Sequence, residues 1–300
     1  MAVNRRLFCT GDPVLDIYAF GKAEDRLLKT DKLERCHGGA LNVWKNLESI
    51  LGRESVNYFS PLKSTSPILL LDTINLYTVY RFIDENSNLI VEGAITPQAN
   101  KSTFYKRKLK EGLLIRFKVF VEEHSNQGDR RGLVISEYNK GAYNGKNIFD
   151  DGVARLPKGT NFEMPKFDFC VIDSRYRSIN LNLISSSKIK IWHATNLEYD
   201  EEFAKNFHYI FHTDGPNKVR IYTGDGKEIG KDDARLEVPN TKIVNTCGAG
   251  DTFTAASASY LLNQDKIREE TLIEAAKFAI KCCQDVITTR CTTATRVSLE

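Results

Sequence analysis

The stretch from Asn245 to Leu262, NTCGAGDTFTAASASYLL, constrains the fold more than any other part of this 300-residue chain. Gly248, Ala249 and Gly250 precede small apolar residues at helical spacing, so a helix is predicted to begin at the glycines. The first turn of a helix has backbone N–H groups without intrahelical partners and carries partial positive charge. The glycines therefore predict a site where main-chain amides hold an anion such as a phosphoryl group.

Asp251 directly follows this predicted anion site. A carboxylate there would repel a phosphate, but it could accept a proton from an attacking hydroxyl group. Alternatively, Asp251 only stabilises the helix dipole from the first turn, by a few tenths of a kcal/mol. The tetrapeptide alone leaves both interpretations open.

The longer string NTCGAGDTF resembles the D-T-x-G-A-G-D-x-F signature of the ribokinase-like (PfkB) carbohydrate kinases. It departs only at Asn245, where the family has aspartate. The resemblance implies that Asp251 is the catalytic base and that the backbone of Gly248, Ala249 and Gly250 forms the anion hole for the transferred phosphate. It also implies ATP and Mg²⁺ as cofactors.

A second motif lies near the N-terminus. The apolar run Leu7–Thr10 predicts a strand whose carboxyl end carries Asp12 and Asp16 in a loop, and residues 37–52 predict a helix. Within that helix, GGALNVWKNL matches the family's substrate-binding motif GGxxNVAxxL. The resemblance implies that sugar hydroxyl groups, which donate to carboxylates and accept from amides, are held by Asp16, Gly38, Gly39 and Asn42.

The remaining chain indicates an α/β, ribokinase-like fold with a mostly parallel central sheet flanked by helices and a small β lid. From Gly132 onward, short apolar runs alternate with segments long enough for crossovers, which predicts parallel strands with ligands at their carboxyl ends. We predict a single kinase domain over residues 1–300, with lid strands mainly from residues 75–121. These strands include a hairpin over residues 77–95 and a further strand at Leu113–Val121.

Two segments flank the anion site in this prediction. Lys242–Val244 resembles a strand that leads into the glycines, and residues 268–285 form an amphipathic pattern typical of a helix. By the family resemblance, this helix and the following loop wall the adenine pocket.

Three weaker strings resemble one branch of the family, the heptose 7-phosphate kinases. They are SEYNKG (136–141), IDSR (172–175) and TTRCTTATRV (288–297), and the first adds Lys140 as a candidate substrate-binding residue. Two further strings resemble family sequences: ATNLEYDE (194–201) stands where the family has T-P-N-x-x-E, which serves the magnesium and phosphates, and HTDGPNKVRIYTGDG (212–226) corresponds to T-x-G-x-x-G followed by a hairpin. By this resemblance, the cofactor-binding residues are Asn196, Thr213 and Gly215. No residue is assigned as a metal ligand.

Several positions depart from these strings. Tyr199 stands where the family has glutamate, and family glycines are replaced by Lys218, Thr289 and Thr292. Two alternatives therefore stay open, namely a kinase for another small polyol or nucleoside and a catalytically silent relative that binds nucleotide or a partner. The intact GAG and Asp251 weigh against the silent relative, because a binding module needs no base.

Composition argues against several other classes. The formal net charge of +3 gives no case for nucleic acid as the main partner, and seven cysteines without a CxxC pair argue against a disulfide framework or a zinc site. No stretch approaches the ~20 apolar residues of a membrane span. We expect a cytoplasmic protein that acts on a small sugar or sugar phosphate. Aromatic residues and exposed edges in the 77–95 hairpin predict a homodimer joined through the lid.

Overall fold

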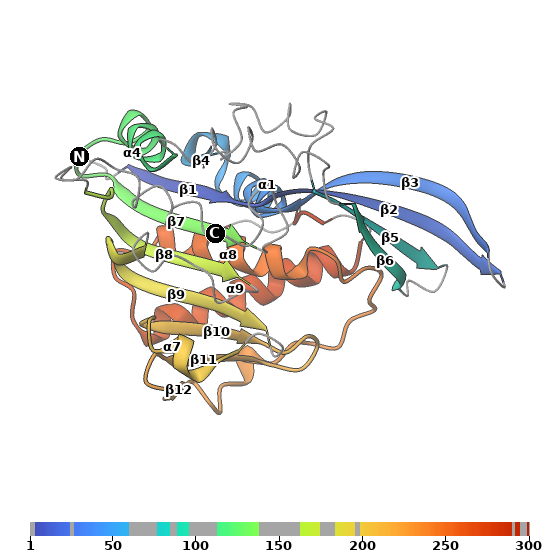
Figure 1. The fold of residues 1–300 in the computed structure, drawn as a ribbon. Helices are drawn as coiled ribbons and strands as arrows, with labels where there is room; N and C mark the ends of the chain where they lie inside the picture. Colours follow the sequence, from blue (N-terminus) through green and yellow to red (C-terminus); the bar gives the residue numbers. More distant parts are fainter. Residues whose placement is uncertain are drawn as a thin grey trace.

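The computed structural model describes residues 4–24, 27–59, 77–84, 89–95, 113–137, 163–174, 184–195, 199–289, 292–294 and 299. In these ranges the strands form two sheets. Figure 1 shows the smaller sheet projecting from one side of the larger one. The main sheet has the order β12-β11-β10-β9-β8-β7-β1-β4. Its strands are β1 (Arg5–Gly11), β4 (Val56–Phe59), β7 (Arg130–Glu137), β8 (Phe167–Ser174), β9 (Ser187–Thr195), β10 (Tyr209–Thr213), β11 (Val219–Thr223) and β12 (Glu228–Ile229).

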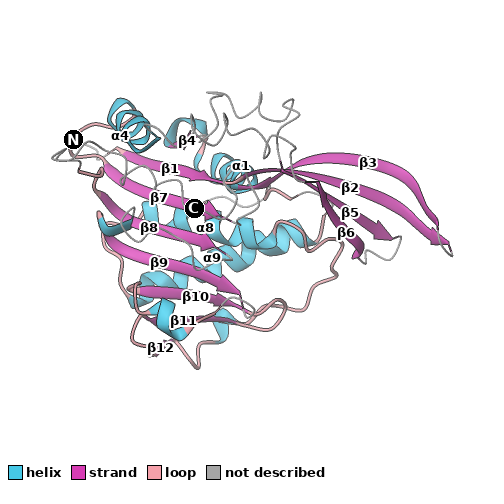
Figure 2. Cartoon of the chain, in the orientation of Figure 1, coloured by secondary structure: helices cyan, strands magenta, loops and turns pink. Residues whose placement is uncertain are grey.

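The main sheet is parallel from β4 to β10, and only β11 and β12 pair antiparallel. Helices cover both of its faces (Figure 2). One face carries α1 (Ala40–Leu51), α8 (Ala249–Leu262) and α9 (Glu269–Ile287), and the other carries α4 (Leu113–Glu123) and α7 (Glu201–Ala204). Short 3₁₀ helices occur at Arg53–Ser55 (η1) and Ala234–Leu236 (η3).

Alternation along the strands explains this layering. In β1, Leu7 and Cys9 belong to the core beneath α1 and α8, whereas Phe8 belongs to the core beneath α4. A parallel sheet with helices on both faces buries successive side chains on opposite sides, so its strands are apolar throughout. Each fully buried Leu or Phe contributes about 1.5–3 kcal/mol relative to exposure. The predicted α/β fold with a mostly parallel sheet is confirmed.

The smaller sheet, here called the lid sheet, has the order β3-β2-β5-β6. Its strands are β2 (Pro13–Glu24), β3 (Leu27–Gly39), β5 (Tyr77–Asp84) and β6 (Leu89–Ile95). Its inner face buries Tyr18, Phe20 and Ile83, and Cys247 from the loop before α8 packs against that cluster. The inner face of the lid sheet therefore lies beside the start of α8.

The prediction that residues 75–121 supply most of the lid is wrong for the described residues. β2 and β3 contribute 12 and 13 residues to the lid sheet, whereas β5 and β6 contribute 8 and 7. Asp16 consequently lies within β2 rather than in a loop. The hairpin over residues 77–95 is confirmed as β5 and β6.

The segment Leu113–Val121 was predicted to be a strand, which is wrong because it forms helix α4. In a strand, Phe117, Val119 and Val121 would share one face. Instead Phe117 and Val121, four residues apart, are fully buried while Val119 is 44% exposed. That spacing is helical.

The expected strand at Lys242–Val244 is also wrong. These residues pair with no strand; instead the backbone N–H groups of Val244 and Asn245 donate to the carbonyl of Ile287 at the end of α9, at 2.7 and 3.2 Å. The helices predicted at residues 37–52 and 268–285 are confirmed as α1 and α9. No helix in the described part of the chain is long and apolar enough to cross a membrane.

Candidate active site

The start of α8 has the backbone geometry expected of an anion site. Gly248 is the N-cap, with φ +83°, and no side chain caps the helix there. A Cβ atom at Gly248 would lie 2.9 Å from Asn42 Nδ2 and 2.9 Å from Thr292 Cβ. Both the left-handed backbone and the close packing therefore require glycine.

Gly250 differs from Gly248 because it borders open space. Apart from its chain neighbours and the adjacent backbone of α8, no described atom lies within 4 Å of the position that a Cβ at Gly250 would take. Gly250 lies in the first turn of this 14-residue helix, where backbone N–H groups lack intrahelical partners. An anion can therefore approach the backbone of Gly250 closely, with the helix dipole in its favour.

Asp251, in the same first turn, is held by α1. The side-chain amide of Asn42 donates from Nδ2 to Asp251 Oδ2 at 2.8 Å. Asn42 is 1% exposed, whereas Asp251 is half-buried. The contact joins two motifs separated by 209 residues, and it fixes the carboxylate that directly follows Gly250.

Asn42 therefore contacts the predicted base directly. The family resemblance implied that this amide holds a sugar hydroxyl group, and in the structure one of its N–H groups is used by Asp251. A hydrogen bond to a carboxylate favours the charged form and fixes its orientation. Asp251 is thus oriented as a proton acceptor.

The predicted sugar-binding residues on the lid sheet also come together. A Cβ at Gly38 would lie 2.5 Å from Asp16 Oδ2, so the carboxylate of β2 rests directly on the backbone of β3. Gly39 follows as the N-cap of α1, with φ +54°. Asp16, Gly38 and Gly39 thereby lie together where the lid sheet joins α1.

Arg81 was missed by the sequence analysis. Its Nη1 atom lies 2.5 Å from Asp16 Oδ1, and its guanidinium lies over the ring of Tyr18, 5.7 Å from the ring centroid. The signal available in the sequence was a single arginine among apolar and aromatic residues of a predicted strand. Burial is the main cause that raises the pKa of Tyr18, so its hydroxyl stays protonated beside this ion pair.

A buried histidine links the carboxyl ends of β9 and β10 to α8. His193 at the end of β9 places Nε2 3.1 Å from Thr213 Oγ1 and Nδ1 2.7 Å from Thr254 Oγ1. Its Nδ1 also lies 3.9 Å from Asp173 Oδ1. Thr213 is thus fixed at the carboxyl end of β10, one residue before the turn that leads to Gly215. Asn196 and Lys140 lie outside the described residues.

Tyr199 is packed among aromatic rings. Its ring stacks on His212 with centroids 4.8 Å apart and on Trp192 at 6.1 Å, and Tyr222 lies 5.7 Å away. Burial lowers the pKa of His212, which stays neutral at pH 7. The described residues contain no group of three His, Cys, Asp or Glu side chains that could hold a metal ion. Tyr199, which stands where the family has glutamate, therefore contributes packing.

The other departures from the family strings are accommodated. Asn245 Oδ1 accepts from the backbone N–H of Cys247 at 3.0 Å, which an aspartate could also do. Thr292 packs against Gly248, Thr289 Oγ1 donates to the carbonyl of Val286 at 3.1 Å, and Lys218 donates to the carbonyl of Lys231. None of these four contacts blocks the open space at Gly250.

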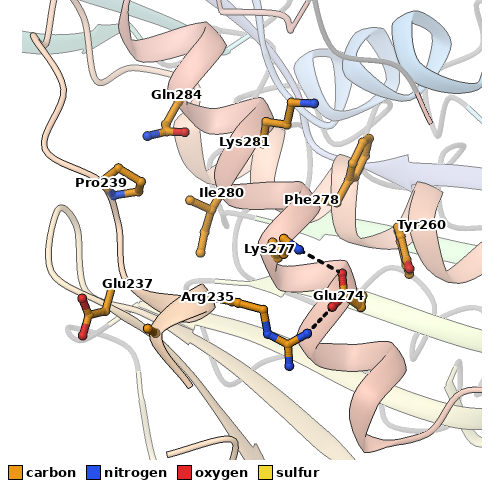
Figure 3. Close-up of a pocket in the computed structure, with 11 residues that line it drawn as sticks. Arg235, Glu237, Pro239, Tyr260, Glu274, Lys277, Phe278, Ile280, Lys281 and Gln284 are labelled. Carbon is orange, nitrogen blue, oxygen red and sulfur yellow. Dashed lines mark hydrogen bonds and ion pairs between the residues drawn. The ribbon is translucent and has the colours of Figure 1, made fainter. Parts of the chain in front are cut away.

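A pocket of about 400 Å³ lies between α9 and the segment that contains η3 (Figure 3). It is lined by Ala234, Arg235, Glu237, Pro239, Tyr260, Glu274, Lys277, Phe278, Ile280, Lys281 and Gln284. At one end, Gln284 Nε2 donates to Thr241 Oγ1 at 3.3 Å. The neighbouring Cys283 Sγ lies 3.2 Å from the carbonyl oxygen of Ala249. That end of the pocket therefore lies close to the start of α8.

Comparisons with known proteins agree with this geometry. Residues 192–297 match the model of the pfkB family carbohydrate kinases. No curated protein sequence matches the chain.

Solved structures share the fold over nearly the whole chain. The ribokinase of Giardia lamblia is 14% identical, with a TM-score of 0.64 over 97% of this chain and 96% of that one. The tetrameric inhibited form of phosphofructokinase-2 from Escherichia coli is 13% identical, with a TM-score of 0.59 over 95% and 94%. A nucleoside kinase of Methanocaldococcus jannaschii, described as an archaeal member of the ribokinase family, is 13% identical, with a TM-score of 0.57 over 99% and 96%.

At these identities the structural similarity speaks for the fold, and the family match covers the part of the chain that holds the anion site and Asp251. Residues 192–297 thus resemble the pfkB family carbohydrate kinases, and the chain shares its fold with solved kinases of the ribokinase type.

Proposed function

We propose that the protein transfers the γ-phosphate of ATP to a hydroxyl group of a sugar or sugar phosphate, with Asp251 as the general base. The observation that carries this proposal is the 2.8 Å hydrogen bond from Asn42 to Asp251 at the start of α8. It holds a half-buried carboxylate next to open space at a helix N-terminus. A proton acceptor and an anion site are the two elements that phosphoryl transfer to a hydroxyl requires.

In this mechanism the acceptor hydroxyl donates its proton to Asp251 as its oxygen attacks the phosphorus. Backbone amides from Gly248 to Gly250 stabilise the charge on the phosphoryl oxygens, because the helix terminus is already oriented before the reaction. Asp16, fixed by Arg81, accepts a hydrogen bond from another hydroxyl of the acceptor. Lys140 and Asn196 keep the substrate and cofactor roles that the family resemblance implies.

The pocket beside α9 is proposed to take the adenosine of ATP. Its end at Gln284 adjoins the start of α8, so a nucleotide there can direct its phosphates toward Gly250. Thr213 and Gly215 would lie on the phosphate side. Family kinases typically use Mg²⁺ with ATP, and because residue 199 offers no carboxylate, we assign that ion to the phosphates and water.

A substitution that fills the pocket tests the nucleotide assignment. Ile280→Trp should raise the KM for ATP at least about fivefold, a barrier change near 1 kcal/mol, with little change in kcat. Val119→Trp, on an exposed position of α4, is the matched control. Equal KM values for the two variants would contradict this placement.

The acceptor is proposed to be a sugar phosphate such as a heptose 7-phosphate. The support is the order of three strings in the sequence, one of which carries Asp173 at the end of β8. ATP turnover should be measured across free sugars, sugar phosphates, polyols and nucleosides. We expect sugar phosphates to have the highest kcat/KM, and added salt to narrow their advantage by screening. Equal turnover of free and phosphorylated sugars would refute the sugar phosphate assignment, and turnover of nucleosides alone would refute a sugar acceptor.

We also propose a homodimer that forms through the outer face of the lid sheet. Leu33 and Tyr80, which lie on that face, are 67% and 43% exposed. Light scattering at micromolar concentration should give twice the chain mass, and Leu33→Lys should reduce it while Val119→Lys should not. A monomeric mass for the unchanged protein would exclude the dimer.

A further inference from the structure

We infer that Asn46, one turn after Asn42 on α1, is a positioning residue that keeps the Asn42 amide in the orientation needed to hold Asp251. The inference rests on the proposed function of Asp251 as the base. It concerns a residue to which neither the motif nor the family match gives a role.

Asn46 is fully buried and uses both ends of its side-chain amide. Its Nδ2 donates to the carbonyl of Asn42 at 2.9 Å and to the carbonyl of Thr292 at 3.2 Å. Its Oδ1 accepts from Thr252 Oγ1 at 3.1 Å and from the backbone N–H of Ala294 at 2.9 Å. A buried amide with this many partners has a single favourable orientation.

The orientation of Asn46 determines that of Asn42. Asn46 Nδ2 lies 3.4 Å from Asn42 Oδ1, so it favours the orientation in which the side-chain oxygen of Asn42 faces Asn46. The Asn42 Nδ2 group then points to Asp251 Oδ2, at 2.8 Å. If the Asn42 amide turned over, its oxygen would face the carboxylate, and an acceptor would oppose an acceptor.

Asn46 also holds the segment that closes around Gly248. Thr292 Cβ and the Thr292 carbonyl oxygen lie 2.9 and 3.1 Å from the position of a Cβ on Gly248. Because Asn46 donates to that carbonyl, it fixes α1, the start of α8 and residues 292–294 relative to one another. A loss of Asn46 should therefore act on the base through Asn42, and on the anion site through Thr292.

The test compares Asn46→Ala with Ser49→Ala. Ser49 Oγ donates to the carbonyl of Ala294 at 2.5 Å, so the control removes a bond between the same two segments without touching Asn42. Asn46→Ala should lower kcat about tenfold and move the acid limb of the kcat profile up by about one pH unit, because the carboxylate loses an oriented donor. Ser49→Ala should leave the pH profile unchanged.

A double-mutant cycle separates positioning from general loss of stability. If Asn46 acts through Asn42, Asn42→Ala and the double variant should show the same pH profile. An additive shift would overturn the inference, as would an unchanged profile in Asn46→Ala.

Thr252→Val, of similar volume, is the second variant if Asn46→Ala does not fold. It removes one donor to Asn46 Oδ1 and should shift the acid limb in the same direction, so an unshifted limb would also overturn the inference. The proposed base is tested separately. A large loss of kcat in Asp251→Asn with a normal profile in Asn46→Ala would refute the role of Asn46 alone.

Discussion

The junction of α1 with α8 and the aromatic cluster around Tyr199 lie at the same carboxyl edge of the main sheet, yet they are built differently. At the junction, polar side chains from distant segments are buried and joined by hydrogen bonds, with Asn46 0% and Asn42 1% exposed. Around Tyr199, rings stack on rings, and the two buried nitrogens of His212 have no hydrogen-bond partner among the residues that the structure describes.

The difference indicates which part of the site must keep a single geometry. A buried polar network costs stability unless every group is satisfied, so it persists where orientation matters. An aromatic cluster contributes packing that tolerates small shifts. We therefore expect substitutions at the junction to change the rate of phosphoryl transfer, and substitutions in the cluster to change stability.

Asp251→Asn should produce the largest effect. The substitution keeps size and most hydrogen bonding but removes the base, so kcat should fall by roughly 10²- to 10⁴-fold, or about 3 to 5.5 kcal/mol. ATP affinity should stay the same or rise, because a negative charge near the γ-phosphate is lost. Steady-state kinetics and nucleotide binding measure both quantities.

A thermal melt must accompany that assay, since a first-turn carboxylate stabilises the helix by about 0.3–1 kcal/mol. Retention of more than about a third of kcat in a folded Asp251→Asn variant would show that Asp251 is not the base.

Gly248→Ala should give the next largest effect, and it has a matched control. Alanine at φ +83° costs roughly 1–2 kcal/mol, and its Cβ must also displace Asn42 or Thr292. Gly226→Ala, at φ +89° in the hairpin turn between β11 and β12, meets no described atom within 4 Å and carries only the backbone cost.

We expect kcat to fall at least tenfold in Gly248→Ala and to stay within about twofold of the unchanged protein in Gly226→Ala. Chemical denaturation should show the larger loss of stability in Gly248→Ala. Equal kcat values in the two variants would mean that close packing at Gly248 has no part in the chemistry.

Local patterns in the sequence predicted much of this architecture. Glycines followed by helical spacing located the starts of α1 and α8, and apolar runs located β7 to β10. Such signals depend on neighbours within a few residues. The same local reasoning failed at Leu113–Val121, where Arg116 and Lys118 suggested alternation although only the burial of Phe117 and Val121 distinguishes a helix.

Contacts between distant segments could not be predicted in this way. Asn46 meets Thr252 across 206 residues and Ala294 across 248, and no local pattern relates them. Arg81 reaches Asp16 only because β5 pairs with β2 in one register. The motifs thus supplied the residues that we propose for the anion site, but not the contacts that orient them.

Tyr199→Ala tests the other half of the comparison. Loss of stacking on His212 and Trp192 should lower the free energy of unfolding by about 1–2 kcal/mol, because each aromatic pair adds roughly 0.5–1.5 kcal/mol. At a temperature where the variant is folded, kcat should stay within about threefold. A loss of kcat as large as that of Gly248→Ala would remove the distinction between the two regions.

The smallest expected effect compares His37, on β3 just before α1, with His212 in the aromatic cluster. Burial, assisted by Lys45, lowers the pKa of His37 to about 4, and burial and Arg220 lower that of His212. In the unfolded chain both titrate near their ordinary value of about 6.5. The unfolded state therefore binds protons first as pH falls, so each neutral histidine contributes stability above about pH 6.5 that is lost at lower pH, down to about pH 4 for His37.

His37→Gln and His212→Gln should each reduce the drop in Tm between pH 7 and pH 5. Because His37 is only half-buried and solvent screens part of its shift, we expect a change of about 1–3 °C, with His212 giving less. Differential scanning fluorimetry at both pH values measures it, with His124→Gln on an exposed part of α4's C-terminal end as the control. If neither variant changed the drop in Tm, the acid sensitivity would be assigned to carboxylates. A larger effect in His212→Gln than in His37→Gln would contradict the expected order.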